Sequence, residues 1–390
     1  MKTVLMTITI FHKKAGGGPK FVHNIIGANP LNYHYTILSC NQFFKNQSLM
    51  ISGNNSIIYL DKVFARFKKF IISPTSFLHL LSSKINIVHI NEYPNFIGDI
   101  ALFYGIIMRY PIILTPHGTL IEKKTKSVTR DAFRHVHDLL LKPLYTRFID
   151  LWISTSKYEK KSIQNFLNNS KNARILPITL GVEKTGSSSD ADRIIFIKKY
   201  GLEGKFIVSY IGRLNERKGI DFLLQAISST KNEIKNLILL IVGPDDGYLG
   251  EINRKISILK IEDYVKILGF LEHKSGVNAA YGCSNVLAFP SNFENFGLVF
   301  VEAAINKVPI ITSAKFTDIF DKNDVFFFHY GDVNKMIEHI KFIWQFPEVA
   351  KEKALKYYNK IMKMESWLQI KAKYERIYTK LISQSNFKCN

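Results

Sequence analysis

Short apolar runs alternate along the chain with longer stretches whose apolar residues recur at helical spacing. This alternation is typical of repeated strand and helix units around a parallel sheet. In the first half we expect strands at 3–11, 35–39, 56–60, 85–90, 111–115, 150–155 and 173–178, and helices at 97–109, 131–147 and 157–167. In the second half we expect strands at 206–212, 237–243, 264–268 and 285–290, helices between and after them, and long helices beyond residue 347.

The periodicity breaks between these halves, at "EKTGSSSDAD" (183–192), where a glycine and three serines favour an exposed linker. A chain of 390 residues also exceeds the usual size of one compact core. We therefore expect an N-terminal domain at 1–182, a linker at 183–192 and a C-terminal domain at 193–364. The fold class is α/β, with two doubly wound parallel-sheet domains facing a cleft, and ligands of such sheets bind at the carboxyl ends of the strands.

The charge is strongly basic and unevenly distributed. The formal net charge is +21, and residues 1–185 hold 24 lysines and arginines against 9 acids, whereas residues 186–390 hold 29 against 23. Such a field favours an anionic partner: a nucleic acid, an anionic membrane surface or a phosphorylated small molecule. A lysine-rich, solvated surface without a specific partner is the alternative.

Cysteine usage and hydropathy indicate a protein of a reducing compartment, and we expect it in the cytoplasm. Cys40, Cys283 and Cys389 are scattered, without the spacing of a disulfide framework or a metal site. The most apolar stretch, 96–114, is interrupted by Asp99, Arg109 and other breaks, so no apolar segment of the ~20 residues needed to cross a bilayer is expected.

One segment suited to binding an anion follows the strand expected at 206–212. The residues "GRLNERKG" (212–219) form a polar loop that leads into a helix, and Arg213 and Lys218 lie on this loop. A helix N-terminus contributes about 0.3–1 kcal/mol to anion binding, whereas a hydrogen bond to a charged group contributes about 1.5–3 kcal/mol. These two side chains should therefore dominate the binding of a diphosphate, unless they are ordinary surface charges.

A second segment, "SNFENFGLVFVEAA" (291–304), places two carboxylates around a predicted helix start. Glu294 falls in the loop after the strand, and Glu302 falls in the second turn of a helix that begins near Phe296 or Gly297. Loop carboxylates accept hydrogen bonds from pairs of sugar hydroxyls, and Gly297 allows backbone N–H groups to approach a ligand closely. Glu294 could instead cap the helix and Glu302 could face solvent, although the apolar neighbours of Glu302 favour a bound partner.

Taken together, "IGRLNERKG" and "AFPSNFENFGLVFVEAA" resemble the paired signature of glycosyltransferase family 4, which consists of retaining enzymes with the two-domain GT-B fold. The resemblance extends to "AGGGP" after the first strand, similar to the family's glycine-rich loop, and to "LTPHG", similar to its His-Gly element. The tail from Trp367 resembles the final helix, at about 365–385, that crosses back onto the first domain.

This resemblance implies a role for each candidate residue. Arg213 and Lys218 would bind the donor diphosphate and stabilise it as the leaving group, Glu294 would contact the transferred sugar, and Glu302 would hold the ribose hydroxyls. His117 would lie near the sugar and the acceptor, although a lone histidine is more often structural. The further donor contacts would come from Phe296, Gly297 and Leu298 at the sugar, Phe270 and Leu271 at the base, and Gly16, Gly17 and Gly18 at the diphosphate.

The same residues suggest a mechanism without a metal or another cofactor. No nucleophile is obvious, and two cations can neutralise the departing diphosphate, so we expect same-face attack rather than a covalent intermediate. The "DAD" at Asp190 to Asp192 matches a metal-binding motif of another glycosyltransferase architecture, but it falls in the expected linker. Asp245 and Asp246 follow a strand, where a turn explains them.

The leading hypothesis is therefore sugar transfer from a nucleotide diphosphate to a glycan, lipid-linked or phosphorylated acceptor on the basic N-terminal domain. Lys123 to Arg130 is the candidate loop that faces the acceptor or an anionic membrane. A nucleotide-sugar epimerase of the same fold is one alternative, and it would turn over donor without acceptor. A basic nucleic-acid-binding protein without catalysis is another, although no recognised binding module supports it.

Overall fold

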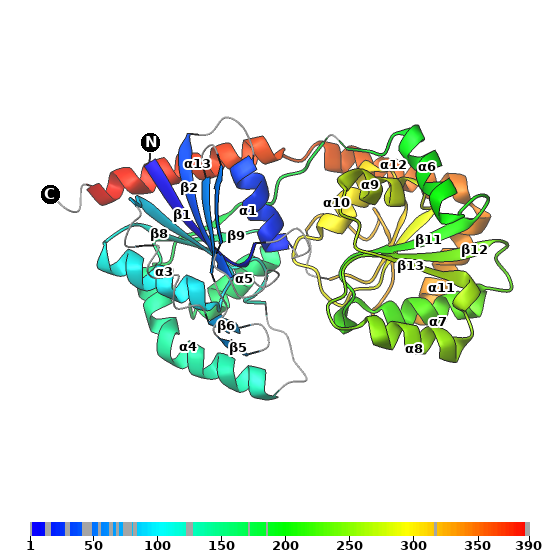
Figure 1. Cartoon of the computed structure of the whole chain (residues 1–390), viewed down its shortest axis with the longest axis horizontal. Helices are drawn as coiled ribbons and strands as arrows, with labels where there is room; N and C mark the ends of the chain where they lie inside the picture. Colours follow the sequence, from blue (N-terminus) through cyan, green and yellow to red (C-terminus); the bar gives the residue numbers. More distant parts are fainter. Residues whose placement is uncertain are drawn as a thin grey trace. The chain divides into compact units, whose positions relative to one another are not determined.

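The computed structural model of the protein describes residues 2–11, 17–27, 32–40, 49–53, 56–61, 65–67, 70–72, 80, 84–121, 128–170, 172–184, 186–315 and 318–386. The chain forms two compact units, an N-terminal domain of residues 1–181 with 365–390 and a C-terminal domain of residues 182–364. The last segment of the chain, which forms α13 (Trp367–Asn386), therefore belongs to the N-terminal domain (Figure 1). No described helix combines the length and the apolar composition that a bilayer crossing requires.

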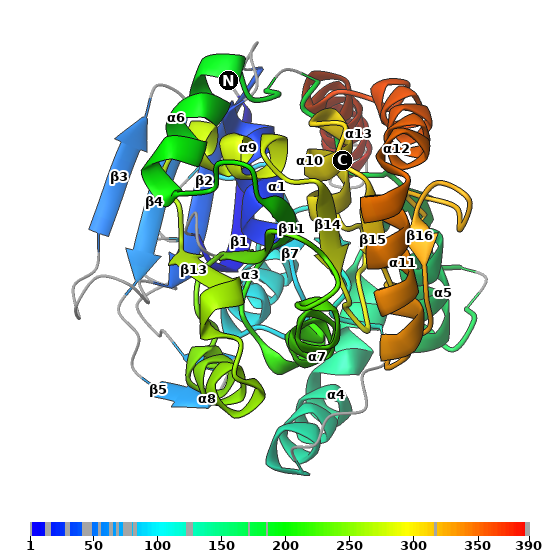
Figure 2. The ribbon, with the colours of Figure 1, turned by 90° about the vertical axis from the view of Figure 1, so that its right-hand side faces the viewer.

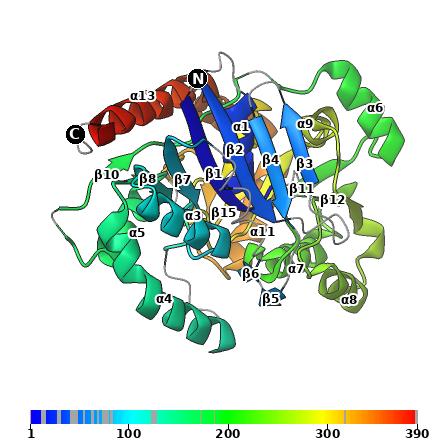
Figure 3. The ribbon, with the colours of Figure 1, turned by 60° about the vertical axis from the view of Figure 1, so that its left-hand side comes forward.

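The N-terminal domain contains an eight-stranded sheet of order β10-β9-β8-β7-β1-β2-β4-β3 (Figure 3). Every described pairing is parallel except that of β3 with β4. The strands are β1 (Lys2–Ile10), β2 (Tyr33–Cys40), β3 (Leu49–Gly53), β4 (Ser56–Asp61), β7 (Ile87–Asn91), β8 (Ile112–Thr115), β9 (Leu151–Ser154) and β10 (Ile175–Pro177). Seven of them match expected strands, whereas β3 and the antiparallel pair β5 (Ala65–Phe67) and β6 (Phe70–Ile72) were not predicted. These three are short and antiparallel, so their order depends on a neighbouring strand more than on their own apolar pattern.

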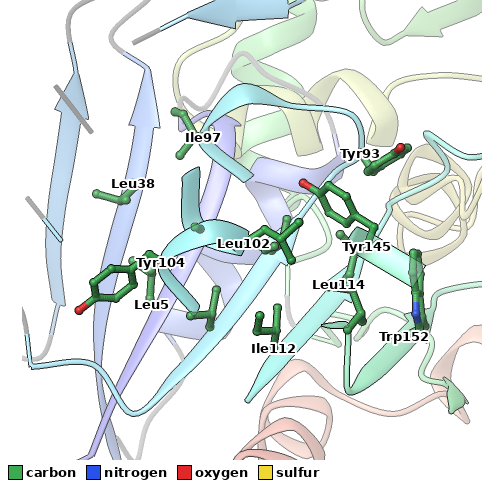
Figure 4. Close-up of a cluster of buried hydrophobic side chains, with 14 of the residues drawn as sticks. Leu5, Leu38, Tyr93, Ile97, Leu102, Tyr104, Ile112, Leu114, Tyr145 and Trp152 are labelled. Carbon is green, nitrogen blue, oxygen red and sulfur yellow. The ribbon is translucent and has the colours of Figure 1, made fainter. Parts of the chain in front are cut away.

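Helices cover both faces of this sheet. On one face α1 (Gly17–Gly27) packs against β1 and α13, and on the other α3 (Phe96–Ile107) packs against β7 and β1. Outside α3 lies α4 (Val128–Phe148), and α5 (Lys157–Phe166) packs against β9 and β10. Figure 4 shows the core on the α3 side, where apolar residues of the strands meet α3 and α4. Its labelled members are Leu5, Leu38, Tyr93, Ile97, Leu102, Tyr104, Ile112, Leu114, Tyr145 and Trp152.

A buried polar network anchors α13 to the same domain. His89 on β7 is fully buried, and its two ring nitrogens each lie 2.8 Å from a hydroxyl oxygen, that of Tyr378 on α13 and that of Thr115 on β8. Burial lowers the pKa of His89 to about 3, so the ring is neutral at physiological pH. Because Thr115 directly precedes the Pro116-His117 loop, α13 is tied to the strand end that carries a candidate site residue.

The C-terminal domain is built on a six-stranded parallel sheet of order β13-β12-β11-β14-β15-β16. Its strands are β11 (Phe206–Ile211), β12 (Leu237–Val242), β13 (Val265–Gly269), β14 (Val286–Phe289), β15 (Ile310–Thr312) and β16 (Phe326–Phe327). One face carries α7 (Ile220–Thr230), α8 (Leu249–Leu259) and α11 (Val333–Gln345), and the other α6 (Asp190–Tyr200), α9 (Lys274–Gly282), α10 (Leu298–Ile305) and α12 (Pro347–Met362) (Figures 1 and 2).

This strand order creates a switch point. The chain leaves β11 for β12 on one side and later returns to β14 on the other, so the loops after β11 and β14 leave the same edge side by side. Ligands of open α/β sheets bind at such points. Both chemistry-bearing segments of the sequence, 212–219 and 291–304, begin there.

The expected linker at 183–192 is wrong at its C-terminal end, because Asp190 to Asp192 form the first turn of α6. Ser189 caps this helix: its Oγ accepts a hydrogen bond from the Asp192 backbone nitrogen at 3.0 Å. The serine run is thus in part a capping signal, Ser-x-x-Asp, rather than a flexible spacer.

Candidate functional site

The turn after β11 is held by one glycine and one acid. Gly219 has φ +67°, and a Cβ there would collide with the carbonyl oxygen of Pro290, so the two switch-point loops approach as closely as only glycine allows. Asp246 accepts hydrogen bonds from Arg213 Nη1 at 3.3 Å and from Asn215 Nδ2 at 3.1 Å. The guanidinium of Arg213 is therefore oriented by a carboxylate from the turn after β12.

The turn after β14 meets the turn after β11 through an ion pair. Lys218 Nζ donates to Glu294 Oε1, and the two side chains keep only 16% and 15% of their surface exposed. Ser291 Oγ donates to the same carboxylate oxygen at 3.1 Å, and Lys218 Nζ lies 5.1 Å from the centre of the Phe289 ring. The structure thus joins two predicted site residues that are 76 positions apart in the chain.

Glu302 is fixed by a tyrosine that was not predicted. It lies on α10, which starts at Leu298 after Gly297, a glycine with φ +82°. Tyr281 on α9 is fully buried, and its hydroxyl donates to Glu302 Oε2 at 3.0 Å. Burial, reinforced by the charge of Glu302, raises the pKa of Tyr281 well above its usual value, which keeps the hydroxyl protonated as a donor.

The other predicted donor contacts of this domain lie along the same edge. Phe296 is buried, Gly297 is the N-cap of α10, and Leu298 is the first residue of that helix. Phe270 and Leu271 follow β13, which is two strands away from β11. Phe270 and Leu271 therefore lie at the same edge of the sheet as the Lys218–Glu294 pair, but at a distance from it along that edge.

In the N-terminal domain, His117 lies on the loop after β8 in a left-handed conformation, with φ +53°. Its Nε2 is hydrogen-bonded to Asn91 Oδ1 at 2.9 Å, and its ring packs against Phe21, with 4.8 Å between ring centres. The ring keeps some exposure, yet burial lowers the pKa of His117 to about 3. The imidazole is accordingly neutral at physiological pH and has a fixed orientation.

Glu159, a fully buried residue of α5, determines the shape of this loop. One carboxylate oxygen accepts from the backbone N–H of Gly118, next to His117. The other accepts from the backbone nitrogen and the hydroxyl of Thr155, at 2.6 and 2.8 Å. Nothing in the sequence near His117 points to Glu159, which lies 41 positions from Gly118.

The predicted glycine-rich loop is described only in part. Gly16 lies outside the described residues. Gly17 and Gly18 are the first residues of α1, and a Cβ on Gly18 would lie 2.9 Å from Glu92 Oε1. Gly18 therefore allows a close approach within its own domain, whereas a Cβ on Gly17 would meet nothing within 4 Å.

The acidic pairs considered as metal ligands have other partners. Asp190 pairs with Arg193, and Asp192 takes part in the cap of α6. Asp245 Oδ1 accepts three backbone N–H groups at 2.8–3.0 Å, and Asp246 holds Arg213. Over the described ranges of the chain, no three histidines, cysteines, aspartates or glutamates gather as a metal site would require.

Comparisons with known proteins relate the chain to glycosyltransferases. Residues 192–361 match the sequence profile of the family described as Glycosyl transferases group 1. An uncharacterised 41.2 kDa protein of the cps region of Klebsiella pneumoniae is 26% identical over 308 residues, covering 75% of this chain and 80% of that protein. A GDP-mannose-dependent alpha-(1-6)-phosphatidylinositol monomannoside mannosyltransferase of Mycolicibacterium smegmatis is 24% identical over 207 residues, about half of each chain.

The fold is shared with solved GT-B structures. Anabaena HepE, solved in complex with UDP and glucose, aligns with a TM-score of 0.76 at 16% identity, covering 97% of this chain and 100% of HepE. At that identity the likeness concerns the fold alone. The C-terminal domain thus carries the glycosyl transferases group 1 sequence, the chain has the two-domain GT-B fold, and the protein is a glycosyltransferase.

Proposed function

We propose that the protein transfers a sugar, with retention of configuration, from a nucleotide diphosphate donor to an acceptor bound by its basic N-terminal domain, as the family 4 resemblance implies. The observation that carries this proposal is the Lys218–Glu294 pair at the switch point of the C-terminal sheet. A cation for a phosphate and a carboxylate for sugar hydroxyls are adjacent there, largely shielded from water, where both interactions are strongest.

In this proposal each predicted residue keeps one role. Lys218 and Arg213 bind the diphosphate and neutralise it as it leaves, so that Lys218 exchanges Glu294 for phosphate oxygens when donor enters. Glu294, freed from that ion pair, accepts hydrogen bonds from the sugar, and Glu302 binds the ribose. His117, neutral and with its Nε2–H donated to Asn91 Oδ1, accepts a hydrogen bond through Nδ1 at the sugar or the acceptor.

The chemical step then needs no protein nucleophile. The acceptor hydroxyl attacks the anomeric carbon on the face that the diphosphate leaves, and a diphosphate oxygen takes the hydroxyl proton. The bond from the anomeric carbon to the diphosphate oxygen breaks as the new glycosidic bond forms. We propose that side chains rather than a metal meet the diphosphate charge, in line with the partners already made by the acidic pairs.

We also propose a glycan, lipid-linked or phosphorylated acceptor and a location at the cytoplasmic face of a membrane. The excess of 24 cations over 9 acids in residues 1–185 supports an anionic or membrane-borne acceptor. The mannosyltransferase relative is named for a phosphatidylinositol monomannoside acceptor, which supports the lipid-linked class. Cys283 forms no disulfide, as a reducing compartment favours.

A thermal-shift screen against nucleoside diphosphates and nucleotide sugars tests the proposal. We expect stabilisation by one family of nucleotide sugars, and product formation only when an acceptor extract is added. Turnover of donor to an isomeric nucleotide sugar without acceptor would indicate an epimerase. Salt-sensitive binding to random DNA without any donor-induced shift would indicate a nucleic-acid-binding protein.

A further inference from the structure

Helix α4 presents an apolar stripe to solvent that the proposed chemistry does not use. Leu139, Leu140 and Val136 expose 71%, 66% and 53% of their surface, and Phe133 exposes 36%. At about 100° per residue, these four side chains fall within an arc of about 120° on one side of the helix. Exposed apolar residues are ordinary when scattered singly, but a stripe along two turns of one helix marks an interaction surface.

The opposite side of α4 is fixed to the domain, so this stripe cannot turn inward. His137 Nε2 lies 3.1 Å from both carboxylate oxygens of Asp99 on α3, and the Tyr145 hydroxyl donates to Asp99 at 2.8 Å. Tyr93 donates to Asp138 at 2.7 Å, and Arg134 pairs with the same aspartate. These contacts orient the helix, and Figure 3 shows it at the outer side of the domain, away from the sheet.

Charge indicates what covers the stripe. Arg147, which is exposed, continues the stripe at the C-terminal end of α4, whereas Lys142 lies about 120° from Val136 and its Nζ is 4.8 Å from the centre of the Phe166 ring. The two acids of the helix, Asp131 and Asp138, project about 140° and 160° away from Val136 around the helix axis. An apolar face that continues into a cation, with the acids turned away, is the pattern of a helix that lies in the interface of an anionic bilayer.

A second copy of the chain fits this surface less well. Residues 1–185 carry 24 lysines and arginines against 9 acids, so two such domains placed face to face would repel each other. The same excess attracts an anionic lipid surface, and that attraction adds to the burial of the apolar side chains.

We propose that the α4 face, defined as Phe133, Val136, Leu139, Leu140 and Arg147, docks the N-terminal domain onto an anionic lipid surface. This inference rests on the proposed function in one respect, because it supplies the contact by which the enzyme would reach a membrane-borne acceptor. It does not depend on the chemistry of the C-terminal domain, so the two can fail separately.

Co-sedimentation of the full chain with vesicles tests the proposal. We expect the parent protein to bind vesicles of phosphatidylcholine with phosphatidylglycerol, more weakly as salt rises, and to bind phosphatidylcholine vesicles poorly. The double variant Leu139→Gln/Leu140→Gln should bind the anionic vesicles at least roughly tenfold more weakly, because it lacks the two largely exposed leucine side chains that would enter the bilayer. Arg147→Gln, which leaves the apolar stripe intact, should weaken binding about fivefold.

The chain offers a matched control on the other domain. Ile194 and Ile195 on α6 are adjacent apolar residues with 54% and 64% exposure, and Ile194→Gln/Ile195→Gln should bind vesicles as the parent does. Equal binding by the two double variants would overturn the proposal, and so would equal binding of the parent to neutral and anionic vesicles. A parent dimer that Leu139→Gln/Leu140→Gln converts to a monomer in light scattering would instead assign the face to a second copy.

Donor-induced thermal shifts measured on the same samples separate this test from that of the proposed function. The α4-face variants should keep the donor shift of the parent, since α4 belongs to the N-terminal domain and the donor is proposed to bind the C-terminal one. Loss of vesicle binding with an intact donor shift therefore supports the docking surface. An intact vesicle profile without any donor shift refutes the proposed function and leaves the docking surface standing.

Discussion

The two domains prepare their candidate residues in opposite ways. At the switch point of the C-terminal sheet the residues are charged and paired with one another: Lys218 with Glu294, and Arg213 with Asp246. On the loop after β8 in the N-terminal domain, His117 is neutral and its loop is held by a buried acid, Glu159. In the first region a ligand must replace existing ion-pair partners. In the second region a ligand contacts a loop whose conformation is already fixed.

This difference indicates how much each region must reorganise when a ligand binds. When a ligand opens an ion pair, each charged side chain loses one charge-assisted contact and gains another. The charges of the donor site can therefore be paired with one another before the ligand binds, and the site can still bind an anion. A neutral imidazole with fixed hydrogen bonds costs little to reorganise, which suits positioning. Substitutions at the proposed diphosphate and ribose contacts of the first region should therefore lower donor affinity, whereas Glu294, as the proposed sugar contact, and the His117 loop should affect turnover.

The largest effect is expected at Glu294. Glu294→Gln removes the carboxylate that pairs with Lys218 and is proposed to hold the sugar, and activity should fall about 10²- to 10³-fold. The rate of sugar transfer at saturating donor measures it. Glu302→Gln, which leaves the Lys218–Glu294 pair in place, should act mainly on donor affinity. If both variants lost donor affinity equally and kept the transfer rate of the parent at saturating donor, the distinction between a sugar contact and a ribose contact would be refuted.

Glu159→Gln should lower kcat about tenfold or more with little change in donor affinity. The amide cannot accept from Gly118 and Thr155 as two carboxylate oxygens do, so the His117 loop loses its fixed geometry. Donor-induced thermal shift and kcat on the same preparation separate the two effects. Glu233→Gln, at an exposed acid paired with Lys341, is the control and should change neither. A fall in donor affinity for Glu159→Gln would show that the two regions are not functionally distinct.

A smaller effect is expected at Tyr281, within the charged region. Tyr281→Phe deletes the hydroxyl that donates to Glu302, and the donor nucleotide should bind roughly 2- to 10-fold more weakly. Calorimetric titration measures the change. Tyr357→Phe is a matched control, because Tyr357 is buried in the same domain and its hydroxyl has no hydrogen-bond partner among the described residues. If both variants bind alike, the Tyr281 hydroxyl does not orient Glu302.

The smallest effect concerns stability against pH in the neutral region. Burial opposes the charging of His137, but hydrogen bonds to Asp138 and Asp99 and their charges outweigh it and raise the pKa of His137 to about 9. Because the folded value exceeds the unfolded value of about 6.5, the contribution is complete below about pH 6.5 and is lost as pH rises through about 9. We expect a loss of roughly 1–2 kcal/mol over that range, in urea unfolding at a series of pH values. His137→Phe should flatten this dependence, and an unchanged slope in the variant would contradict it.

Much of the architecture follows from local pattern. Buried strands such as β11 and β14 read as continuous apolar runs, and the strand order of a doubly wound sheet then brings their loops together, which made Lys218 and Glu294 foreseeable partners. The boundary of α6 was missed because serine serves both linkers and N-caps, and only the hydrogen bond of Ser189 distinguishes them. The catalytic roles assigned to the site residues remain predictions.

The supporting contacts could not be found in the sequence. Tyr281 and Glu302 are 21 positions apart, and Glu159 and Gly118 are 41 apart, with no periodic or motif-like relation between them. Such pairs form because a buried polar group needs a partner, and the partner is chosen by packing in three dimensions. The same holds for His89, whose partner Tyr378 comes from the far end of the chain.

The central claim is that Lys218, in the turn after β11, and Glu302, on α10, both bind the donor in the C-terminal domain. Calorimetric titration of the nucleoside diphosphate selected by the thermal-shift screen tests it most directly, with the parent, Lys218→Ala and Glu302→Ala compared under one buffer. The account predicts that each variant binds about 10- to 100-fold more weakly, as expected when a hydrogen bond to a charged group is lost. Binding of both variants as tight as that of the parent would contradict it.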